Sequence, residues 1–318
     1  MSQQPPRALP PKGNSSLTIV AAVVVLIAVA VGAYFFFFQK GGDVAGGPGV
    51  EVSETQALVG GGKVGDVKAF LEKSIGPENL AKAKYTIDGN TVKDVSIPTP
   101  EGKEMKIKEI KFLALDTEHD EPYYMDVRVT GFEAELPPDQ IPGVTSVKGD
   151  IVYAYEFDPA AKTLTIPHTA FNFPGLTNLE ISGKFTGVEK MAGGTPEEAM
   201  SGMAGAKIEK LHIVWADAKV FRAMLERAAQ NQGMTLDQLQ AGMQAAIPTL
   251  KEKTGDVGKE VLGAAETIVK KVDNVTVTID ANPAEPFPLA GFLALAMGPG
   301  GAPNFDSLKP LNLKIEAE

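Results

Sequence analysis

The sequence predicts an α+β fold: an N-terminal single transmembrane helix, then a mostly antiparallel β-sheet covered by amphipathic helices. Three observations indicate this class. A long apolar run without charges lies near the N-terminus, short segments with alternating apolar residues follow, and the C-terminal third changes to a helical period. The chain has 318 residues, of which 44% are hydrophobic, so its composition is that of a folded domain.

The apolar run covers residues 17–38 and contains no charged side chain. About 22 residues at ~1.5 Å each reach roughly 33 Å, which is enough for the ~30 Å hydrocarbon layer. The alternative is a signal peptide cleaved after the small residues at 28–30, but the apolar run continues beyond that point. We therefore expect an uncleaved signal-anchor, with these membrane-anchoring residues: Leu17, Ile19, Val24, Leu26, Tyr34, Phe35 and Phe38.

The charges that flank this run predict its orientation. Arg7 and Lys12 precede it without any acid, whereas three acids follow Lys40 before the next lysine. The positive-inside rule then places the N-terminus in the cytoplasm, which predicts a single-pass protein of the bacterial inner membrane with a periplasmic main domain. The predicted division is a cytoplasmic tail, the transmembrane helix, a glycine-rich linker and an extracytoplasmic α+β domain, at residues 1–16, 17–38, 39–63 and 64–318.

Within the main domain, the apolar period changes from two to 3.6 and back again. A short amphipathic helix is expected around Val67–Ile75, and helices are expected at about 217–271, where Thr235 and Gln238 form a capping box. Residues 85–90 offer a turn signal, and period-two alternation or strand-like composition predicts strands at 92–97, 105–108, 110–115, 125–129, 151–157, 163–166, 179–185, 211–215, 275–279 and 311–315. Because the chain ends on strands, we expect the helices to lie over the sheet.

Composition excludes several classes of function. The formal charge is −10 and no basic stripe is present, so nucleic acid is not expected as a partner. Cysteine is absent, which excludes disulfides, cysteine-ligated metals and a thiol nucleophile. No nucleotide-binding, zinc-protease or serine-hydrolase motif occurs, and we predict no cofactor and no catalytic residue.

The densest group of oxygen ligands is the segment Asp116, Thr117, Glu118, His119, Asp120 and Glu121. Asp116, Glu118, His119 and Asp120 are candidate ligands for a divalent cation, but a solvated hairpin tip explains the segment equally well. His168 and His212 are interpreted as structural residues. Met200 and Met203 could bind copper through thioether groups, although one face of a helix is the simpler interpretation.

The stretch from Tyr155 to Val188 carries a resemblance. Its order of tyrosine, aspartate, turn and alternating strand resembles that of YdgA-like and AsmA-like bacterial envelope proteins, and the later helical pair and the NPAEPFP segment fit the same pattern. Tyr85 to Pro98 matches Tyr155 to Pro167 in the same order, which indicates either a duplication or recurrent hairpin composition. The resemblance implies a role in the cell envelope and carries over no functional residue.

Two function hypotheses follow. The first is a non-enzymatic, membrane-anchored binding or scaffold protein, held by membrane lipid through its anchor and engaging a lipid ligand or a membrane-protein partner. The alternative is an envelope hydrolase that uses a pair of carboxylates. An apolar groove beside the sheet would favour the first hypothesis, and a polar cleft with two convergent acids would favour the second.

Overall fold

The computed structural model describes residues 59–75, 80–98, 104–119, 121–135, 144–189, 205–217, 219–289 and 305–318. Its strands are β1 (Lys84–Asp88), β2 (Thr91–Pro98), β3 (Glu104–Leu115), β4 (Tyr124–Glu135), β5 (Ser146–Asp158), β6 (Thr163–Phe173), β7 (Thr177–Thr186), β8 (Lys207–Asp217), β9 (Val275–Ala281), β10 (Phe287–Pro288) and β11 (Leu313–Ala317). Its helices are α2 (Val67–Ile75), α5 (Val220–Asn231), α6 (Leu236–Glu252), α7 (Asp256–Lys271) and the 3-10 helices η1 (Val59–Gly62) and η2 (Phe305–Leu311).

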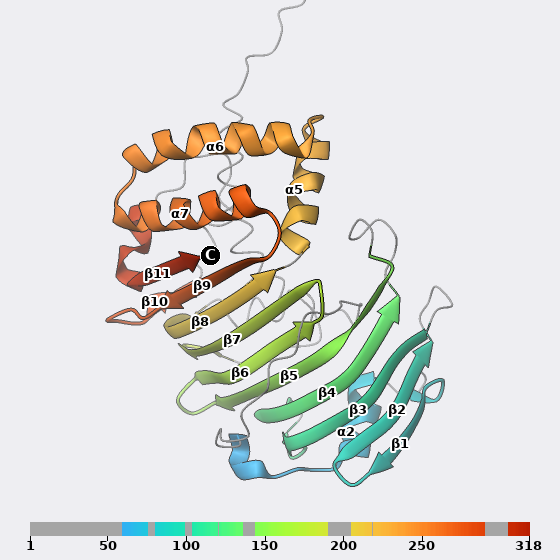
Figure 1. Cartoon of the computed structure of the whole chain (residues 1–318). Helices are drawn as coiled ribbons and strands as arrows, with labels where there is room; N and C mark the ends of the chain where they lie inside the picture. The colour runs from blue at the N-terminus through green and yellow to red at the C-terminus, as the bar shows by residue number, and fades with distance from the viewer. Residues whose placement is uncertain are drawn as a thin grey trace, which may run out of the picture.

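All eleven strands form one antiparallel sheet (Figure 1). From β1 to β9 each strand lies beside the next one in the sequence; β11 pairs with β9, and β10 pairs with the start of β8. The sheet prediction is confirmed. β3 is a single strand where the sequence predicted two segments, and β4 continues past Val129 through a register shift at Gly131, whose φ of 65° suits glycine.

One face of the sheet, called here the helical face, carries a continuous apolar row. The row crosses eight paired strands, from β3 to β11, through Phe112, Val127, Tyr153, Thr169, Ile181, Ile213, Ile279 and Ile315. Residues that are paired across antiparallel strands point to the same face, so this register gives the whole sheet one apolar side.

Two hydrophobic cores lie on the helical face. At the β1–β4 end, Val67 and Leu71 of α2 pack against residues of β2 and β3, including Val92. At the other end, Leu262 and Ile268 of α7 pack with buried residues of β8 and β9. The partly buried side chains of Met125, Tyr153 and Phe171 contact both cores and connect them.

Helices α5, α6 and α7 form a layer over the β8–β11 end, with α7 between α6 and the strands (Figure 1). A third apolar cluster, which includes Leu225, Met243 and Val269, holds the three helices together. The predicted capping box is present: the backbone N–H of Gln238 donates to Thr235 Oγ1 at 3.2 Å, and that of Thr235 donates to Gln238 Oε1 at 2.9 Å.

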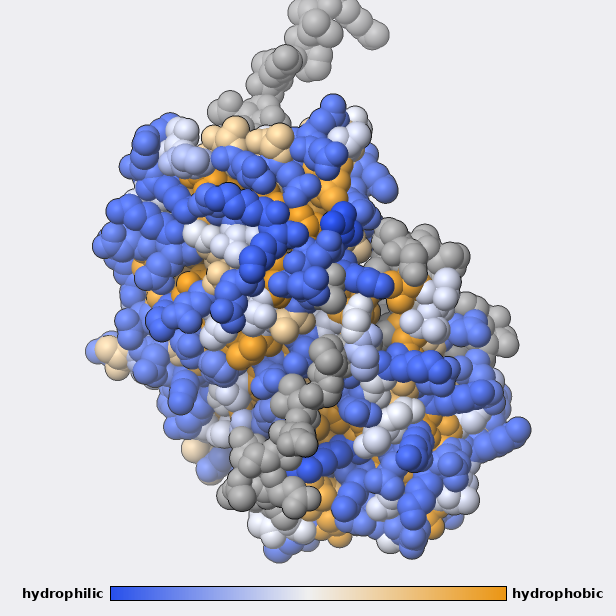
Figure 2. Space-filling model, in the orientation of Figure 1, coloured by the Kyte–Doolittle hydropathy of each residue, from blue (hydrophilic) through white to orange (hydrophobic). Residues whose placement is uncertain are grey.

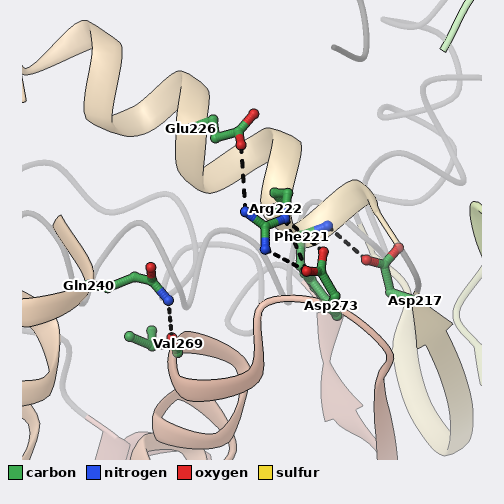
Figure 3. A network of polar contacts seen from close by, with 7 residues as sticks. All are labelled: Asp217, Phe221, Arg222, Glu226, Gln240, Val269 and Asp273. Atoms are coloured by element: carbon green, nitrogen blue, oxygen red, sulfur yellow. Dashed lines mark hydrogen bonds and ion pairs between the residues drawn. The ribbon is translucent and has the colours of Figure 1, made fainter. Parts of the chain in front are cut away.

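Polar contacts join the helices of this layer to the sheet and to one another (Figure 3). Asp217, at the end of β8, accepts the backbone N–H of Phe221 at 2.8 Å and so caps α5. Arg222 of α5 donates through Nε to Asp273, which precedes β9, at 2.8 Å. Gln240 of α6 donates to the carbonyl oxygen of Val269 in α7 at 2.7 Å.

The transmembrane helix is the part of the predicted fold class that the structure corrects. Of the helices in the described residues, none is both long and apolar enough to cross a bilayer. The four α-helices are amphipathic; α7, for example, buries Val261 and Ile268 but also carries Lys259, Glu260 and Glu266. Residues 17–38 lie outside the described residues, so the single-pass anchor, its residues Leu17, Ile19, Val24, Leu26, Tyr34, Phe35 and Phe38, and the inner-membrane localisation are not supported and are withdrawn.

Asp217 should make stability depend on pH. Burial raises the pKa of Asp217 from its ordinary 3.8 to about 6, against the lowering effect of the N–H donors of Phe221 and Val220. Between pH 4 and 6 the unfolded chain releases this proton while the folded chain retains it, so the Asp217 contribution to stability falls as pH rises, by about 3 kcal/mol in total. Asp217→Asn should remove this loss. The free energy of unfolding by urea, measured relative to the wild type, should therefore be higher for the variant at pH 7 than at pH 4.

Asp273→Asn is the control of opposite sign. The side-chain hydrogen bond from Arg222 lowers the pKa of Asp273, so this carboxylate contributes stability above the pKa of the unfolded chain and loses it as pH falls. The Asp273→Asn variant should therefore lose more stability at pH 7 than at pH 4. A parallel response of the two variants to pH would contradict the assignment for Asp217.

Candidate functional site

The candidate site lies on the face of the sheet opposite the helices, called here the polar face. In one row, Asp126 of β4 is paired with Ala154 of β5, which is paired with His168 of β6. In the next row, Arg128 stands opposite Val152, and Ala170 stands opposite Glu180 of β7. A floor of small apolar side chains on β5 and β6 therefore has charged and polar groups around it.

A bulge in β6 brings His168 to this face. Proline has no N–H to donate to a ladder and is therefore found at bulges and edges of sheets. Ile166 and Thr169 pair with Gly183 and Ile181, so Pro167 and His168 together face one residue of β7. The extra residue reverses the alternation of side chains, and His168 points to the same face as Ala154.

Several buried polar atoms at this site have no partner among the described residues. Asp126 and Asn172 are only 8% and 9% exposed, and each has an unpartnered Oδ1. The other unpartnered buried atoms of the polar face are Arg128 Nε, His168 Nε2 and Asn178 Oδ1. Asn172 and Asn178 are paired across β6 and β7, so the five atoms come from three strands around Ala154 and Ala170. Buried polar atoms in folded proteins are usually hydrogen-bonded, which makes this concentration informative.

The charges of the site act on one another. Burial raises the pKa of Asp126, although Arg128 and His168 act in the opposite direction. Burial also lowers the pKa of His168, helped by Arg128 and opposed by Glu180 and Asp126, so the imidazole is neutral at neutral pH. Around the floor the site thus holds one guanidinium, a neutral imidazole and two carboxyl groups.

The polar row continues beyond the site. On the adjacent strands Ser182 is paired with His212, and His212 is paired with Asp280, whose Oδ1 lies 2.7 Å from His212 Nδ1. These three residue types occur in nucleophilic triads. However, no hydrogen bond joins Ser182 to His212 in this fully described part of the sheet, and His212 and Asp280 are 39% and 45% exposed in their side chains. We interpret His212 and Asp280 as a hydrogen-bonded pair on the surface.

Two of the predicted metal candidates, Asp116 and His119, contact each other in the loop between β3 and β4. Asp116 is buried, and its carboxylate accepts the backbone N–H groups of Tyr123 and Glu118 at 2.8 and 2.9 Å, while Oδ2 lies 2.7 Å from His119 Nδ1. Burial opposes ionisation, but these partners keep the pKa of Asp116 below its ordinary value. The described residues include no group of three or more acidic or histidine residues arranged to bind a metal. Asp120, Met200 and Met203 lie outside the described residues.

Sequence reasoning did not find the polar-face residues. His168 was interpreted as a structural histidine at a strand end, and Asp126 and Arg128 were read only as alternating positions of a strand. The signal available in the sequence was that an acid and an arginine, Asp126 and Arg128, occupy alternate positions of one predicted strand and therefore lie on the same face. The register that places them beside His168 is a tertiary property.

Comparison with known proteins adds little to this picture. A family model described only as an uncharacterized protein matches residues 170–318, which run from the second half of β6 to β11. A search of curated proteins found no match. The matched region includes Asn172, Asn178 and Glu180 but excludes Asp126 and His168, and the resemblance to YdgA-like and AsmA-like proteins stays a prediction.

Replacing the unpartnered groups should stabilise the fold. An unpartnered buried polar atom costs about 1–3 kcal/mol, so Asp126→Leu and Asn172→Leu should each raise the free energy of unfolding by about 1–2 kcal/mol. Chemical denaturation of the full chain would measure this. Thr169→Val is a matched control, since Thr169 Oγ1 is also buried and unpartnered but lies on the helical face. Destabilisation by both leucine variants would show that these groups serve the fold.

Proposed function

We propose that this protein is a non-catalytic binding protein that holds a polar ligand on the polar face of its sheet. The observation that carries this proposal is the set of five unpartnered buried atoms on β4, β6 and β7. A fold has no use for such atoms, because each loses its contacts with water and gains none in the protein. A ligand that pairs with them would recover this free energy on binding, which is the usual basis of specificity at a polar site.

The position of the site supports binding by a rigid scaffold. The four strands β4–β7 lie between the two cores, and Met125, Tyr153 and Phe171 on their opposite side contact both. Side chains that stand on a sheet packed in this way lose little further freedom when a ligand binds, so less conformational entropy opposes binding.

A polar ligand has more support than the lipid expected from the sequence. Lipid chains require a continuous apolar surface, and Ile87 of β1 is the one large hydrophobic side chain that is exposed in the described residues. Figure 2 shows a surface on which hydrophilic residues dominate, with smaller apolar patches between them. On the polar face, the residues around the buried Ala154 and Ala170 are charged groups and amides, two of which, Asp126 and Asn172, are themselves buried.

Binding also has more support than hydrolysis. The two carboxyl groups of the site come from Asp126 on β4 and Glu180 on β7, with two strands between them. A carboxylate pair held apart by the sheet favours contacts with separate parts of one ligand.

Native mass spectrometry of the full chain would test the proposal. The protein would be incubated with four classes of probe: neutral sugars, short neutral peptides, inorganic phosphate and vesicles of phosphatidylcholine. We expect one of the first three classes, and not the vesicles, to add a retained mass to the wild type and to Thr169→Val but not to Asp126→Leu or Asn172→Leu. We expect the probe to be recovered chemically unchanged. Binding that is indifferent to Asp126→Leu and Asn172→Leu, or conversion of a probe, would overturn the proposal.

A further inference from the structure

We infer that β1, an edge strand of the sheet, is a self-association surface at which two copies of this chain pair antiparallel about Thr86. β1 ends the strand order, and β2 is the one described strand that pairs with it. Its residues are exposed except Tyr85, which is partly buried. An exposed edge strand can add a strand from another chain. Two strands, β2 and β3, separate this surface from the proposed binding site on β4–β7.

The apolar side chains of β1 indicate that this edge is covered by another chain. Ile87 is 36% exposed and is the one exposed large hydrophobic side chain in the described residues. Its partner on β2, Val92, is buried in the core of the helical face, so Ile87 stands at the outer border of that face. Tyr85 lies two residues earlier, points to the same face and packs partly on the same core. A further strand beside β1 would cover both side chains.

The backbone of β1 is suited to accept such a strand. The extra residue of the bulge in the β1–β2 ladder belongs to β2, so β1 keeps its strict alternation. Asp88 and Thr91 flank a two-residue turn, and residues in this position of a hairpin direct their backbone groups to one another. Alternation then directs the N–H and C=O groups of Ile87 and Tyr85 to the open edge, where a second strand would pair with them.

The side chains of β1 select a second copy of the same strand. In antiparallel pairing about Thr86, Lys84 stands opposite Asp88 of the second copy. Tyr85 in turn stands opposite Ile87 of the second copy, and the two-fold axis repeats both contacts. Opposite charges, and an aromatic side chain beside a β-branched one, are pairs that stabilise neighbouring strands. The strand is therefore complementary to itself in both charge and apolar contact.

The carboxylate of Asp88 is accessible for this contact. Its Oδ2 lies 3.1 Å from Lys93 Nζ, but the side chain remains 79% exposed. The other edge strand, β11, differs because its apolar side chains are buried in the core and Lys314 already pairs with Glu316 on the same strand. Pairing of β1 with β11 of a second copy would also leave further edges open and continue into a filament, whereas β1 with β1 closes as a dimer.

Sedimentation velocity of the full chain at micromolar to submillimolar concentration tests the dimer. The wild type should show a weak monomer–dimer equilibrium, because two short strands bury little surface. Asp88→Lys and Lys84→Asp each place like charges opposite one another twice, and each should weaken dimerisation about tenfold. An equimolar mixture of the two variants places opposite charges at both pairs and should restore the dimer. Glu316→Lys, the same charge change on β11, should dimerise as the wild type does.

Introduced thiols test the register, since the chain has no cysteine of its own. Thr86→Cys places the two thiols at the two-fold axis, where opposite Cα atoms are about 4.5–5.5 Å apart and a disulfide can form. Mild oxidation should therefore give a covalent dimer. Asp88→Cys places its thiols about 14 Å apart, at ~3.4 Å per residue, and should stay monomeric. A mixture of Asp88→Cys with Lys84→Cys should cross-link.

The contrary outcomes are distinct. A chain that stays monomeric at submillimolar concentration, with no cross-link through Thr86→Cys, overturns the inference. A dimer that Asp88→Lys and Lys84→Asp do not weaken, or that their mixture does not restore, lies on another surface and overturns it as well. Filaments that Glu316→Lys weakens as strongly as Asp88→Lys would show that β1 meets β11 instead. Recovery in the mixture excludes misfolding as the cause of weak association, because the mixture contains the same two variant chains.

Discussion

The shared register of the central strands is the constraint on which the rest of the structure depends. Because Val127, Tyr153 and Ile181 belong to one row of paired positions, every strand from β3 to β11 turns its apolar side chains to the same side. A slip of one residue in any ladder would bring its polar side chains into the core. The two cores at the ends of the sheet are both built on this one apolar face. Because alternate side chains point to opposite sides, the same register places the polar residues on the other face.

Pro167 shows how a single residue changes that parity. Strict alternation from Ile166 would place His168 on the helical face, among aromatic and aliphatic side chains. The bulge at Pro167 and His168 restores Thr169 to the apolar row and moves His168 over to Ala154. The cost remains visible on the helical face, where Thr169 is fully buried with an unpartnered hydroxyl. The bulge thus serves the polar face at some expense to the core, which is consistent with a functional role for His168.

Much of the fold could be predicted from the sequence, because strands, helices and the capping box at Thr235 and Gln238 are recorded in local periodicity and local hydrogen bonding. The candidate site could not, since it depends on which strands are neighbours and on a register shift that periodicity does not reveal. The sequence also left two interpretations of the segment at Asp116 open, a cation site and a hairpin tip, because it does not show that the backbone N–H groups of Glu118 and Tyr123 donate to this carboxylate. The predicted transmembrane helix rested on residues 17–38 alone, and the described helices are instead amphipathic elements that pack on the sheet.

The balance between the two faces explains how unpartnered polar atoms can persist. The free energy of unfolding of an ordinary domain is only about 5–15 kcal/mol, so several buried atoms without partners reduce it substantially. Here the unpartnered atoms lie on strands of the β4–β7 region. The row of paired residues from Phe112 to Ile315 connects these strands to both hydrophobic cores. The helices supply the apolar contacts on one side, whereas the opposite side buries polar groups such as Asp126 and Asn172. A sheet built in this way can hold Asp126, Arg128, His168 and Asn172 rigidly apart from one another, which is the arrangement that the proposed binding function requires.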